Sequence, residues 1–372
     1  MSKMKSRNKR LLVLSVGYGQ GHHSAAAALA EYYIGRGWNA RIVDICEKTH
    51  PFCFRLTQWF YDCCVRVLPW LWRITYDLTD TADWRRLIKV PLLRHLTTCL
   101  HELLDSYEPD LIICTYPLYA YMLDELRMNG VIVPPYVMVV TDAREISRPW
   151  MCSAAQLVVV PDAGSRAKVI ERYALAEEQV IAAGFPVRAG FVPSGTLAPP
   201  AAGKLRILYG AYRQLPGVVN DIRALMAAFP GLHLTVLAGR RATALKRILS
   251  EEAGAGDLQI LSATEQMAEY MKRSHLYIGK AGAATMFECY ACQVPVLINY
   301  TLPGQEQGNL ELLLEQACGC RVESTAHLIS TVQWLLENEG RYWQQMRANM
   351  SRTAGALATK RIAEAIFKEF GI

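Results

Sequence analysis

The sequence predicts an α/β protein made of two doubly wound, mostly parallel sheets. Its 372 residues are too many for one ordinary domain and suit two of about 180 residues each. Short apolar runs alternate with segments of helical spacing, and a stretch rich in Pro, Ala and Gly at residues 193–204 separates two such series. We expect an N-terminal domain at 1–196, a linker at 197–204, a second domain at 205–355 and a C-terminal helix at 356–372.

The expected strands are apolar runs that lie between amphipathic segments. In the first series they are residues 11–15, 40–43, 111–115, 136–141, 157–161 and 180–184. In the second series they are residues 205–209, 232–237, 258–260, 275–278 and 294–299. The clearest helical segments are residues 24–36 and 92–107. Because strands and helices alternate, each series predicts a sheet covered by helices on both faces.

Composition narrows the class of partner. The chain is 52% hydrophobic and 20% charged, with a net charge of +6. Mild positive charge suits phosphorylated substrates or anionic lipid surfaces, and the lack of an RNA- or DNA-binding motif argues against nucleic acid. No apolar run approaches the roughly 20 residues that span a bilayer, and the basic N-terminus leads into a strand without a signal-peptide apolar region. We therefore expect a cytoplasmic protein.

The eleven cysteines are scattered along the chain. Cys289 and Cys292 form the only C-x-x-C pair, and no second pair or neighbouring histidine pair completes a zinc site. We expect reduced thiols that pack as small residues, and neither a metal nor a cofactor.

Residues 279–292, GKAGAATMFECYAC, constrain function more tightly than any other segment. Gly279 and Gly282 follow an apolar strand and let backbone amides approach a ligand closely. The composition from Thr285 onward is helical, so the loop feeds into a helix N-terminus, whose unpaired N–H groups and dipole attract anions. Glu288 lies one turn into that helix, where its carboxylate can accept hydrogen bonds from ribose hydroxyls.

A second polar cluster, GQEQGN at residues 304–309, follows the next apolar strand. Open α/β sheets bind ligands at the carboxyl ends of their strands. The side chains of Gln305 and Glu306 suit sugar hydroxyls there, and Asn309 suits a helix cap or a phosphate contact. The two loops together predict a site for a diphosphate, a ribose and a sugar.

These loops resemble the donor-binding signature of the monogalactosyldiacylglycerol synthase and diacylglycerol glucosyltransferase group of glycosyltransferase family 28. Residues 10 to 320 carry further resemblances in the expected order. They are GYGQGHHSAA at 17–26, similar to the family's S-x-G-x-G-H-x-x-A-A, then Tyr116-Pro117, Val140-Thr141-Asp142 and GFPVR at 184–188 with Phe191.

The resemblance implies a GT-B fold, in which two Rossmann-like doubly wound domains face each other across a cleft. The nucleotide-sugar binds the C-terminal domain and the acceptor binds the N-terminal one, which the last helix braces. Amides of Gly282 and Ala283 would contact the diphosphate. The donor-binding residues expected on this basis are Gly210, Arg213, Lys280, Ala281, Gly282, Ala283, Thr285, Glu288, Gln305, Glu306 and Asn309.

Transfer from a nucleotide-sugar needs a base for the acceptor hydroxyl and positive potential at the leaving diphosphate. His22 follows the glycine turn after the first strand, and its imidazole can take the acceptor proton. Asp142 ends a strand and either orients a base, acts as the base, or caps a helix. A helix N-terminus can stabilise the leaving group, and no D-x-D loop is present, so we expect a metal-independent enzyme; the resemblance implies that it inverts the anomeric centre.

Residues 52–94 interrupt the alternation with aromatic side chains and interleaved arginines. Such a mixture suits a bilayer interface, where rings lie at headgroup depth and cations meet lipid phosphates. The alternative is a helical subdomain with an aromatic core. The resemblance favours the membrane, and the expected acceptor and membrane residues are Gly19, Gly21, Trp59, Trp70, Trp72, Arg73, Trp84, Arg85 and Arg86.

The chain departs from the family pattern at residues 209–214, where a glycine-rich loop is usual and only Gly210 remains. Close backbone approach to the diphosphate is in doubt there unless the Arg213 side chain compensates. Ser147 also stands where related enzymes often have histidine, and Gln293 where glycine is common.

Together these observations predict a glycosyltransferase that is peripheral on the inner face of the cell membrane. It would move a hexose from UDP-glucose or UDP-galactose to diacylglycerol and make a β-glycolipid, with anionic lipids as its surface. Two alternatives stay open: another lipid or polyprenyl-linked acceptor, and a catalytically weakened sensor of nucleotide-sugar.

Overall fold

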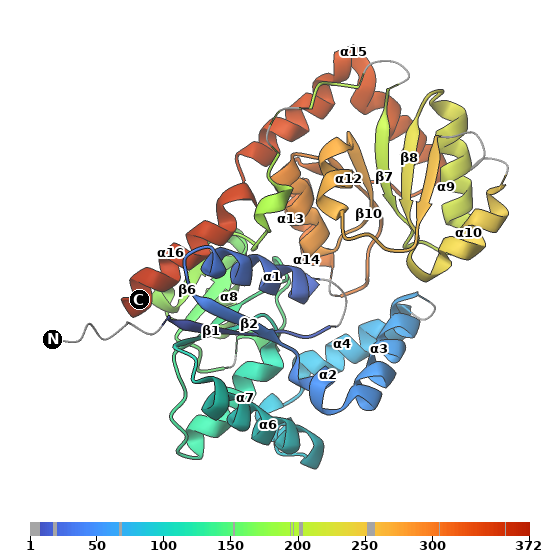
Figure 1. The fold of residues 1–372 in the computed structure, drawn as a ribbon. Helices are drawn as coiled ribbons and strands as arrows, with labels where there is room; N and C mark the ends of the chain where they lie inside the picture. The colour runs from blue at the N-terminus through green and yellow to red at the C-terminus, as the bar shows by residue number, and fades with distance from the viewer. Residues whose placement is uncertain are drawn as a thin grey trace. The chain divides into compact units, whose positions relative to one another are not determined.

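The structure is a computed structural model that divides the chain into two compact units, Met1–Arg188 with Leu357–Ile372, and Ala189–Ala356 (Figure 1). The residues that it describes are 8–17, 21–66, 69–151, 153–193, 195, 197–200, 204–250, 257–304, 306–353 and 355–372. Two predicted site residues, Gly19 and Gln305, therefore lie outside the described residues, as does part of the predicted linker.

The first unit contains a six-stranded parallel sheet with the strand order β2-β1-β3-β4-β5-β6. Its strands are β1 (Arg10–Leu14), β2 (Asn39–Val43), β3 (Leu111–Cys114), β4 (Tyr136–Val139), β5 (Leu157–Val160) and β6 (Val180–Ala182). The central strands are apolar throughout and fully buried, because helices cover both faces of the sheet. The order reverses between β1 and β3, so the carboxyl ends of these two strands form the switch point where such sheets bind ligands.

The helices of the first unit begin close to where helical spacing and prolines place them. They are α1 (Gly21–Ile34), α2 (Ile45–Thr49), α3 (Pro51–Arg66), α4 (Pro69–Thr81), α5 (Trp84–Leu87), α6 (Pro91–Tyr107), α7 (Pro117–Met128), α8 (Ala163–Tyr173) and α16 (Ala358–Phe370). Short 3-10 turns occur at η1 (Arg148–Trp150) and η2 (Glu177–Gln179). Proline occupies the first turn of α6 and α7, where its missing N–H costs nothing.

Helix α16, the last of the chain, is part of the first unit and lies beside α1 (Figure 1). The ring of Phe367 meets that of Tyr33 edge-on at a centroid distance of 5.3 Å. The Thr359 hydroxyl accepts from the Val187 N–H at 2.9 Å and donates to the Val187 carbonyl at 2.7 Å. The apolar face of this helix is thereby buried against the core strands of the first sheet.

The second unit contains a six-stranded parallel sheet with the order β12-β11-β10-β7-β8-β9. Its strands are β7 (Arg206–Gly210), β8 (His233–Leu237), β9 (Leu258–Leu261), β10 (Leu276–Lys280), β11 (Val296–Tyr300) and β12 (Gly319–Arg321). Here the order reverses between β7 and β10, as in a dinucleotide-binding sheet. The prediction of two Rossmann-like, doubly wound domains is thus confirmed, and β12 is a strand that the apolar pattern did not predict.

The second unit's helices cover both faces of this sheet (Figure 1). They are α9 (Leu215–Ala228), α10 (Ala242–Ile248), α12 (Met267–Arg273), α13 (Ala283–Cys292), α14 (Gln307–Glu315) and α15 (Thr325–Ser351), with 3-10 turns η3 (Ala189–Phe191), η4 (Gly239–Arg241) and η5 (Gly355–Leu357). Helix α15 is two helices joined by a kink at residues 337–340, where Asn338, Glu339 and Gly340 have positive φ. In the described part of the chain, no helix is both long enough and apolar enough to cross a bilayer.

The two units divide after Arg188, earlier than the proline-rich stretch predicted. The reason lies in η3, whose Phe191 is buried and whose carbonyl accepts a hydrogen bond from Cys292 Sγ at 2.9 Å. Because Cys292 belongs to α13, this contact ties residues 189–191 to the second unit.

Candidate functional site

His22 lies at the switch point of the first sheet, in the first turn of α1. Its Nδ1 shares a hydrogen bond of 2.8 Å with the Thr141 hydroxyl, and the ring also bonds to the backbone of Thr115. Thr115 follows β3 and Thr141 follows β4, so residues after three adjacent strands (β1, β3 and β4) meet at this ring. The position predicted from sequence is therefore one where the fold brings polar groups together.

The environment of His22 keeps its imidazole neutral. The side chain is buried, with Tyr116 edge-on at 5.2 Å and Trp150 at 6.0 Å between ring centroids. Burial lowers the pKa of His22 from 6.5 to about 4, against the raising effect of its hydrogen bond to Thr115. The ring is thus unprotonated at neutral pH, as a base must be, and its hydrogen bonds to Thr141 and Thr115 hold it in place.

Asp142, the second predicted catalytic residue, directly follows the threonine that contacts His22. It is buried, with 7% of its surface exposed. Burial, and then the charge of Asp142, raises the pKa of Tyr76 on α4. The carboxylate therefore lies within electrostatic reach of Tyr76 on the aromatic helix α4.

Helix α3 contacts the loop that leads to His22. Gln58 Nε2 donates to the Gly17 carbonyl at 2.9 Å, and the Phe54 ring lies so close to Gly17 that an added Cβ would meet it at 3.2 Å. Gly21, expected in the acceptor site, starts α1 with open space around it. The aromatic segment and the loop are thus one packed assembly within the first unit.

Helices α3 and α4 also expose large apolar side chains in two rows of helical spacing. Trp59 is 58% exposed and Trp70 is 62% exposed. Among the side chains that the structure describes, the exposed large apolar residues on these helices are Phe52, Leu56, Trp59, Phe60, Trp70, Ile74 and Leu78. An aromatic core for the whole segment is therefore wrong, because only part of it, such as Phe54, is buried.

The other predicted membrane residues divide by exposure. Trp72 and Trp84 are half-buried, and the indole N–H of Trp84 donates to the Thr79 carbonyl at 2.9 Å. Arg73, Arg85 and Arg86 are exposed. Arg73 pairs loosely with Asp77 at 3.9 Å, and Arg86 pairs with Asp83 at 3.1 Å. Of these arginines, Arg73 lies on α4 next to its exposed row, and Arg85 and Arg86 lie on α5.

The predicted phosphate loop in the second unit runs from β10 through Gly282 into α13. Gly282 is the residue before the first helical turn. The sequence predicted a helix from Thr285 onward, and the helix begins two residues earlier, at Ala283. The Lys280 ammonium pairs with Glu306 and lies beside Gly282, where an added Cβ would meet Nζ at 2.9 Å. A cation therefore sits at the positive end of the helix dipole, which is an arrangement suited to an anion.

The GQEQGN segment holds this loop in place. Asn309 donates its Nδ2 hydrogen to the Ala281 carbonyl at 3.0 Å, and Glu306 Oε2 accepts from the Leu302 N–H at 3.0 Å. Both side chains are almost fully buried. Asn309 lies inside α14, so it clamps the phosphate loop and does not cap the helix as the sequence had suggested.

Glu288 is buried in the second turn of α13, with 7% exposed. A solvated surface carboxylate is thereby excluded. Burial, and then the charge of Glu288, raises the pKa of Cys292 to about 12, so this C-x-x-C thiol stays protonated. Thr285, also predicted in the site, is partly exposed one turn earlier on the same helix.

A buried polar cluster around Asp221 supports the loop after β7, and sequence analysis missed it. Asp221 is fully buried on α9. Its carboxylate accepts hydrogen bonds from the Tyr209 hydroxyl at 2.7 Å and the Thr325 hydroxyl at 2.6 Å, and Arg213 Nη1 donates to both of its oxygens at 2.9 Å. Asn299 adds a bond to the Tyr209 hydroxyl at 3.0 Å. The one available signal was a lone aspartate in an apolar helical stretch. The Arg213 guanidinium, expected at the diphosphate, is held by this cluster.

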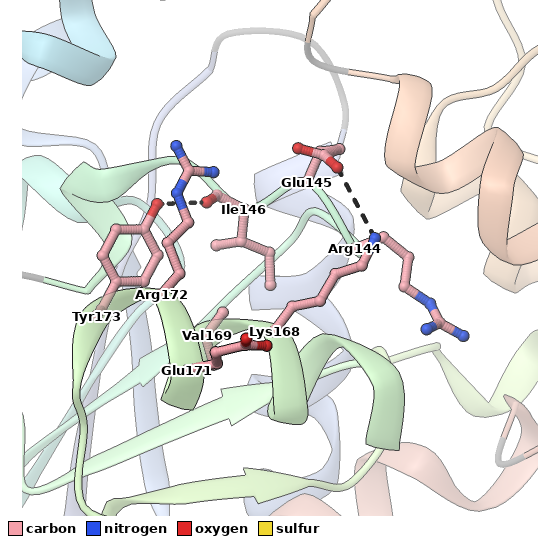
Figure 2. A pocket seen from close by; sticks show the side chains of 8 residues that line it. All are labelled: Arg144, Glu145, Ile146, Lys168, Val169, Glu171, Arg172 and Tyr173. Atoms are coloured by element: carbon pink, nitrogen blue, oxygen red, sulfur yellow. Dashed lines mark hydrogen bonds and ion pairs between the residues drawn. The ribbon is translucent and has the colours of Figure 1, made fainter.

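A cavity of about 300 Å³ lies in the first unit next to the loop after Asp142 (Figure 2). Residues 144–146 form one wall and α8 the other. Its charges are matched within the protein: Lys168 Nζ lies 3.8 Å from Glu145 Oε1, and the Arg144 guanidinium lies 3.3 Å from Asp162. None of the predicted site residues lines this cavity. No group of three or more potential metal-ligating side chains occurs in the described ranges.

Comparison with known proteins gives matches along most of the chain. The family description "Monogalactosyldiacylglycerol (MGDG) synthase" matches residues 22–187, and "Glycosyltransferase family 28 C-terminal domain" matches residues 219–366. The processive diacylglycerol beta-glucosyltransferase of Bacillus subtilis (strain 168) is 26% identical over 376 residues, covering 97% of this chain and 96% of the relative. The enzyme of the same name from Bacillus mycoides (strain KBAB4) is 26% identical over 368 residues, covering 93% and 90%.

Solved structures show the same fold at low identity. A UDP complex of MnaA from S. aureus has a TM-score of 0.64 at 12% identity, covering 98% of this chain and 97% of the other. MurG from Acinetobacter baumannii has a TM-score of 0.60 at 16% identity, covering 97% and 99%. CalG4, the calicheamicin glycosyltransferase, has a TM-score of 0.58 at 14% identity, covering 98% and 99%. These likenesses confirm the GT-B fold class.

Proposed function

The chain belongs to the monogalactosyldiacylglycerol synthase group of glycosyltransferase family 28, and on that premise we propose that it transfers a hexose from a UDP-sugar to diacylglycerol. The observation that carries the proposal is the anion site of the second unit. There a ten-residue helix begins at a glycine, and a lysine ammonium lies beside that N-terminus. Buried carboxylates at Glu288 and Glu306 lie on the same helix and on the adjoining loop.

Each part of the UDP-sugar, namely the diphosphate, the ribose and the hexose, would be bound by a different one of these groups. Diphosphate oxygens accept hydrogen bonds from the free amides at the start of α13, with Lys280 supplying charge. Glu288 holds the ribose, and the loop around Glu306 holds the hexose. Developing charge on the departing UDP oxygen is stabilised by the helix N-terminus and by Lys280, so the leaving group needs no other acid.

The acceptor hydroxyl belongs to the first unit in this proposal. Its oxygen attacks C1 of the hexose, the bond between C1 and the UDP oxygen breaks, and the hydroxyl proton passes to neutral His22 or to Asp142. Attack on the face opposite the leaving UDP inverts the anomeric centre and gives a β-glycosyl-diacylglycerol. The Thr141 hydroxyl and the Thr115 backbone orient the imidazole for this step.

The exposed rows of α3 and α4 supply the surface that meets the lipid. Aromatic and aliphatic side chains at Trp59, Trp70 and their neighbours enter the headgroup region, and the exposed arginines meet anionic lipid phosphates. Gln58 of α3 bonds to the Gly17 carbonyl, so the membrane-facing helix is joined to the loop before His22. The protein would therefore work as a peripheral enzyme on the inner face of the cell membrane.

The test is a transfer assay with purified full-length protein, radiolabelled UDP-glucose or UDP-galactose, and anionic vesicles that contain diacylglycerol. We expect label in a lipid-extractable β-glycolipid, with UDP-glucose the better donor because the curated relatives are named glucosyltransferases. His22→Asn should lower kcat by about 100-fold to 10,000-fold, the usual contribution of a general base. Label on polyprenyl phosphate in place of diacylglycerol, or UDP binding without any lipid product, would overturn the proposal.

A further inference from the structure

Tyr277 of β10 carries a hydroxyl at the switch point of the second sheet. The side chain is 1% exposed. Ile278 of β10 pairs with Tyr209 of β7, so Gly279 and Gly210 lie side by side where these two strands end. An added Cβ at Gly210 would meet the Tyr277 hydroxyl at 2.9 Å, and one at Gly279 would overlap it. The two glycines thus leave a notch, and the hydroxyl occupies it.

This hydroxyl lies among the groups assigned to the donor. Burial raises the pKa of Tyr277 well above 10, and Tyr212, Glu306 and Glu288 contribute to the shift through their charges. The phenol is therefore a neutral hydrogen-bond donor at all working pH values. Among the described residues, no side chain or backbone group forms a hydrogen bond with it. The hydroxyl oxygen is not among the fully enclosed polar atoms that lack a partner, so a ligand atom can reach it and accept its hydrogen bond.

The loop after β7 offers few donors of its own to a diphosphate. The Ala211 N–H donates to the Leu237 carbonyl at 3.0 Å, and the Tyr212 N–H donates to the Gly210 carbonyl at 2.9 Å. The Arg213 guanidinium packs against Gly217 and bonds to Asp221. The two amides next to Gly210 are thus engaged inside the protein, as is one edge of the arginine.

We propose that the Tyr277 hydroxyl donates a hydrogen bond to the diphosphate of the UDP-sugar and replaces the backbone donors that the loop at residues 209–214 does not supply. The charges of Glu288 and Glu306, assigned to the ribose and to the hexose, both act on Tyr277, and the diphosphate of an extended donor must pass between those two carboxylates. Tyr277 is then a positioning residue for the leaving group. The inference rests on the proposed function, since it assumes that a UDP-sugar binds this unit.

Binding of UDP and of uridine by calorimetry tests the proposal without any acceptor lipid. Tyr277→Phe keeps the ring and removes the donor, so UDP affinity should fall about tenfold or more, as for loss of a hydrogen bond to a charged group. Uridine affinity should change less than about twofold, since uridine has no diphosphate. Tyr290→Phe, another buried tyrosine on α13 outside the site, is the matched control and should leave both affinities unchanged.

A second variant distinguishes loss of the hydroxyl from a change in packing. Gly279→Ala places a methyl group where the hydroxyl lies and should weaken UDP binding in the wild-type background. In the Tyr277→Phe background the same change should cost less, because the hydroxyl is gone and only the ring, whose Cζ the added Cβ would meet at 2.7 Å, still has to move. UDP affinity in Tyr277→Phe within twofold of wild type, or equal losses for UDP and uridine, would overturn the inference. Wild-type protein that binds no UDP would instead overturn the proposed function.

Discussion

The neutral, buried state of His22 predicts that the first unit loses stability in mild acid. Burial lowers the pKa of His22 from 6.5 to about 4. Between these two values the unfolded chain binds a proton on this residue and the folded chain does not. The unfolded state is therefore increasingly favoured as pH falls from 6.5 towards 4, and the stability is fully present above 6.5.

The size of the effect follows from the shift in pKa. A difference of about 2.5 pH units is worth about 3 kcal/mol when complete, at about 1.4 kcal/mol per unit. At pH 5 the loss from this one group is about 2 kcal/mol relative to pH 7. That is a large part of the stability of an ordinary domain.

Hydrogen exchange measured by mass spectrometry at pH 7 and pH 5, corrected for intrinsic rates, gives this loss segment by segment. The perturbation is His22→Asn, whose amide can still bond to Thr141 but does not titrate. Peptides from β1, β3 and β4 should lose about 2 kcal/mol less protection between the two pH values in the variant than in wild type.

The second unit provides the control in the same experiment. His275 accepts a hydrogen bond from the Arg206 N–H at 3.0 Å, and burial, then the charge of Arg206, lowers its pKa to about 4. Peptides from β7 and β10 should therefore weaken in acid to the same extent in both proteins. Equal acid losses in β1, β3 and β4 of wild type and His22→Asn would refute the reasoning.

Two further predictions follow from exposure and from buried charge. Replacing Trp59 and Trp70 by Gln should weaken binding to anionic vesicles, measured by sedimentation, about tenfold per residue because apolar ring area is lost. The control Ile132→Gln changes a residue that is 94% exposed away from these helices and should not weaken binding. Equal effects of the two kinds of change would contradict an interface on α3 and α4. Asp221→Asn should lower the free energy of unfolding of the second unit, measured in urea, by about 3 kcal/mol, because Arg213 and its neighbours lose a buried charged partner. The control Glu323→Gln removes one partner of an exposed ion pair and should change this free energy by under about 0.5 kcal/mol. Similar small effects for both variants would contradict the stabilising role of the Asp221 cluster.

Much of the fold could be predicted because buried parallel strands are apolar along their whole length. Strands such as LVVV at β5 stand out in the sequence for that reason. Strand β12, with the sequence GCR, has no apolar run and was not predicted; it forms because its backbone pairs with β11. Helix starts were predicted within a few residues, since a glycine such as Gly282 can precede a helix or continue a loop.

The site could be predicted only in part, because motifs give residue types and not the bonds between them. His22, Glu288 and Glu306 were predicted from three glycine-containing segments, and all three are buried in the structure. Asp221 was missed because a carboxylate within a helix usually faces water. Tyr277 was counted as part of an apolar strand. The space around its hydroxyl depends on the register of β7 and β10, which places two glycines beside it and cannot be read from the sequence.

The two switch points meet opposite electrostatic requirements. In the first unit the first turn of α1 carries a histidine, and burial beside Tyr116 and Trp150 keeps it neutral. In the second unit the turn before α13 delivers glycine and a lysine ammonium, so the helix dipole stays open to an anion. A base must be unprotonated to accept a proton, and a departing diphosphate must be met by positive potential. Neither site could perform the task of the other. A neutral, desolvated histidine cannot stabilise the charge of a diphosphate, and the positive end of a helix cannot accept a proton.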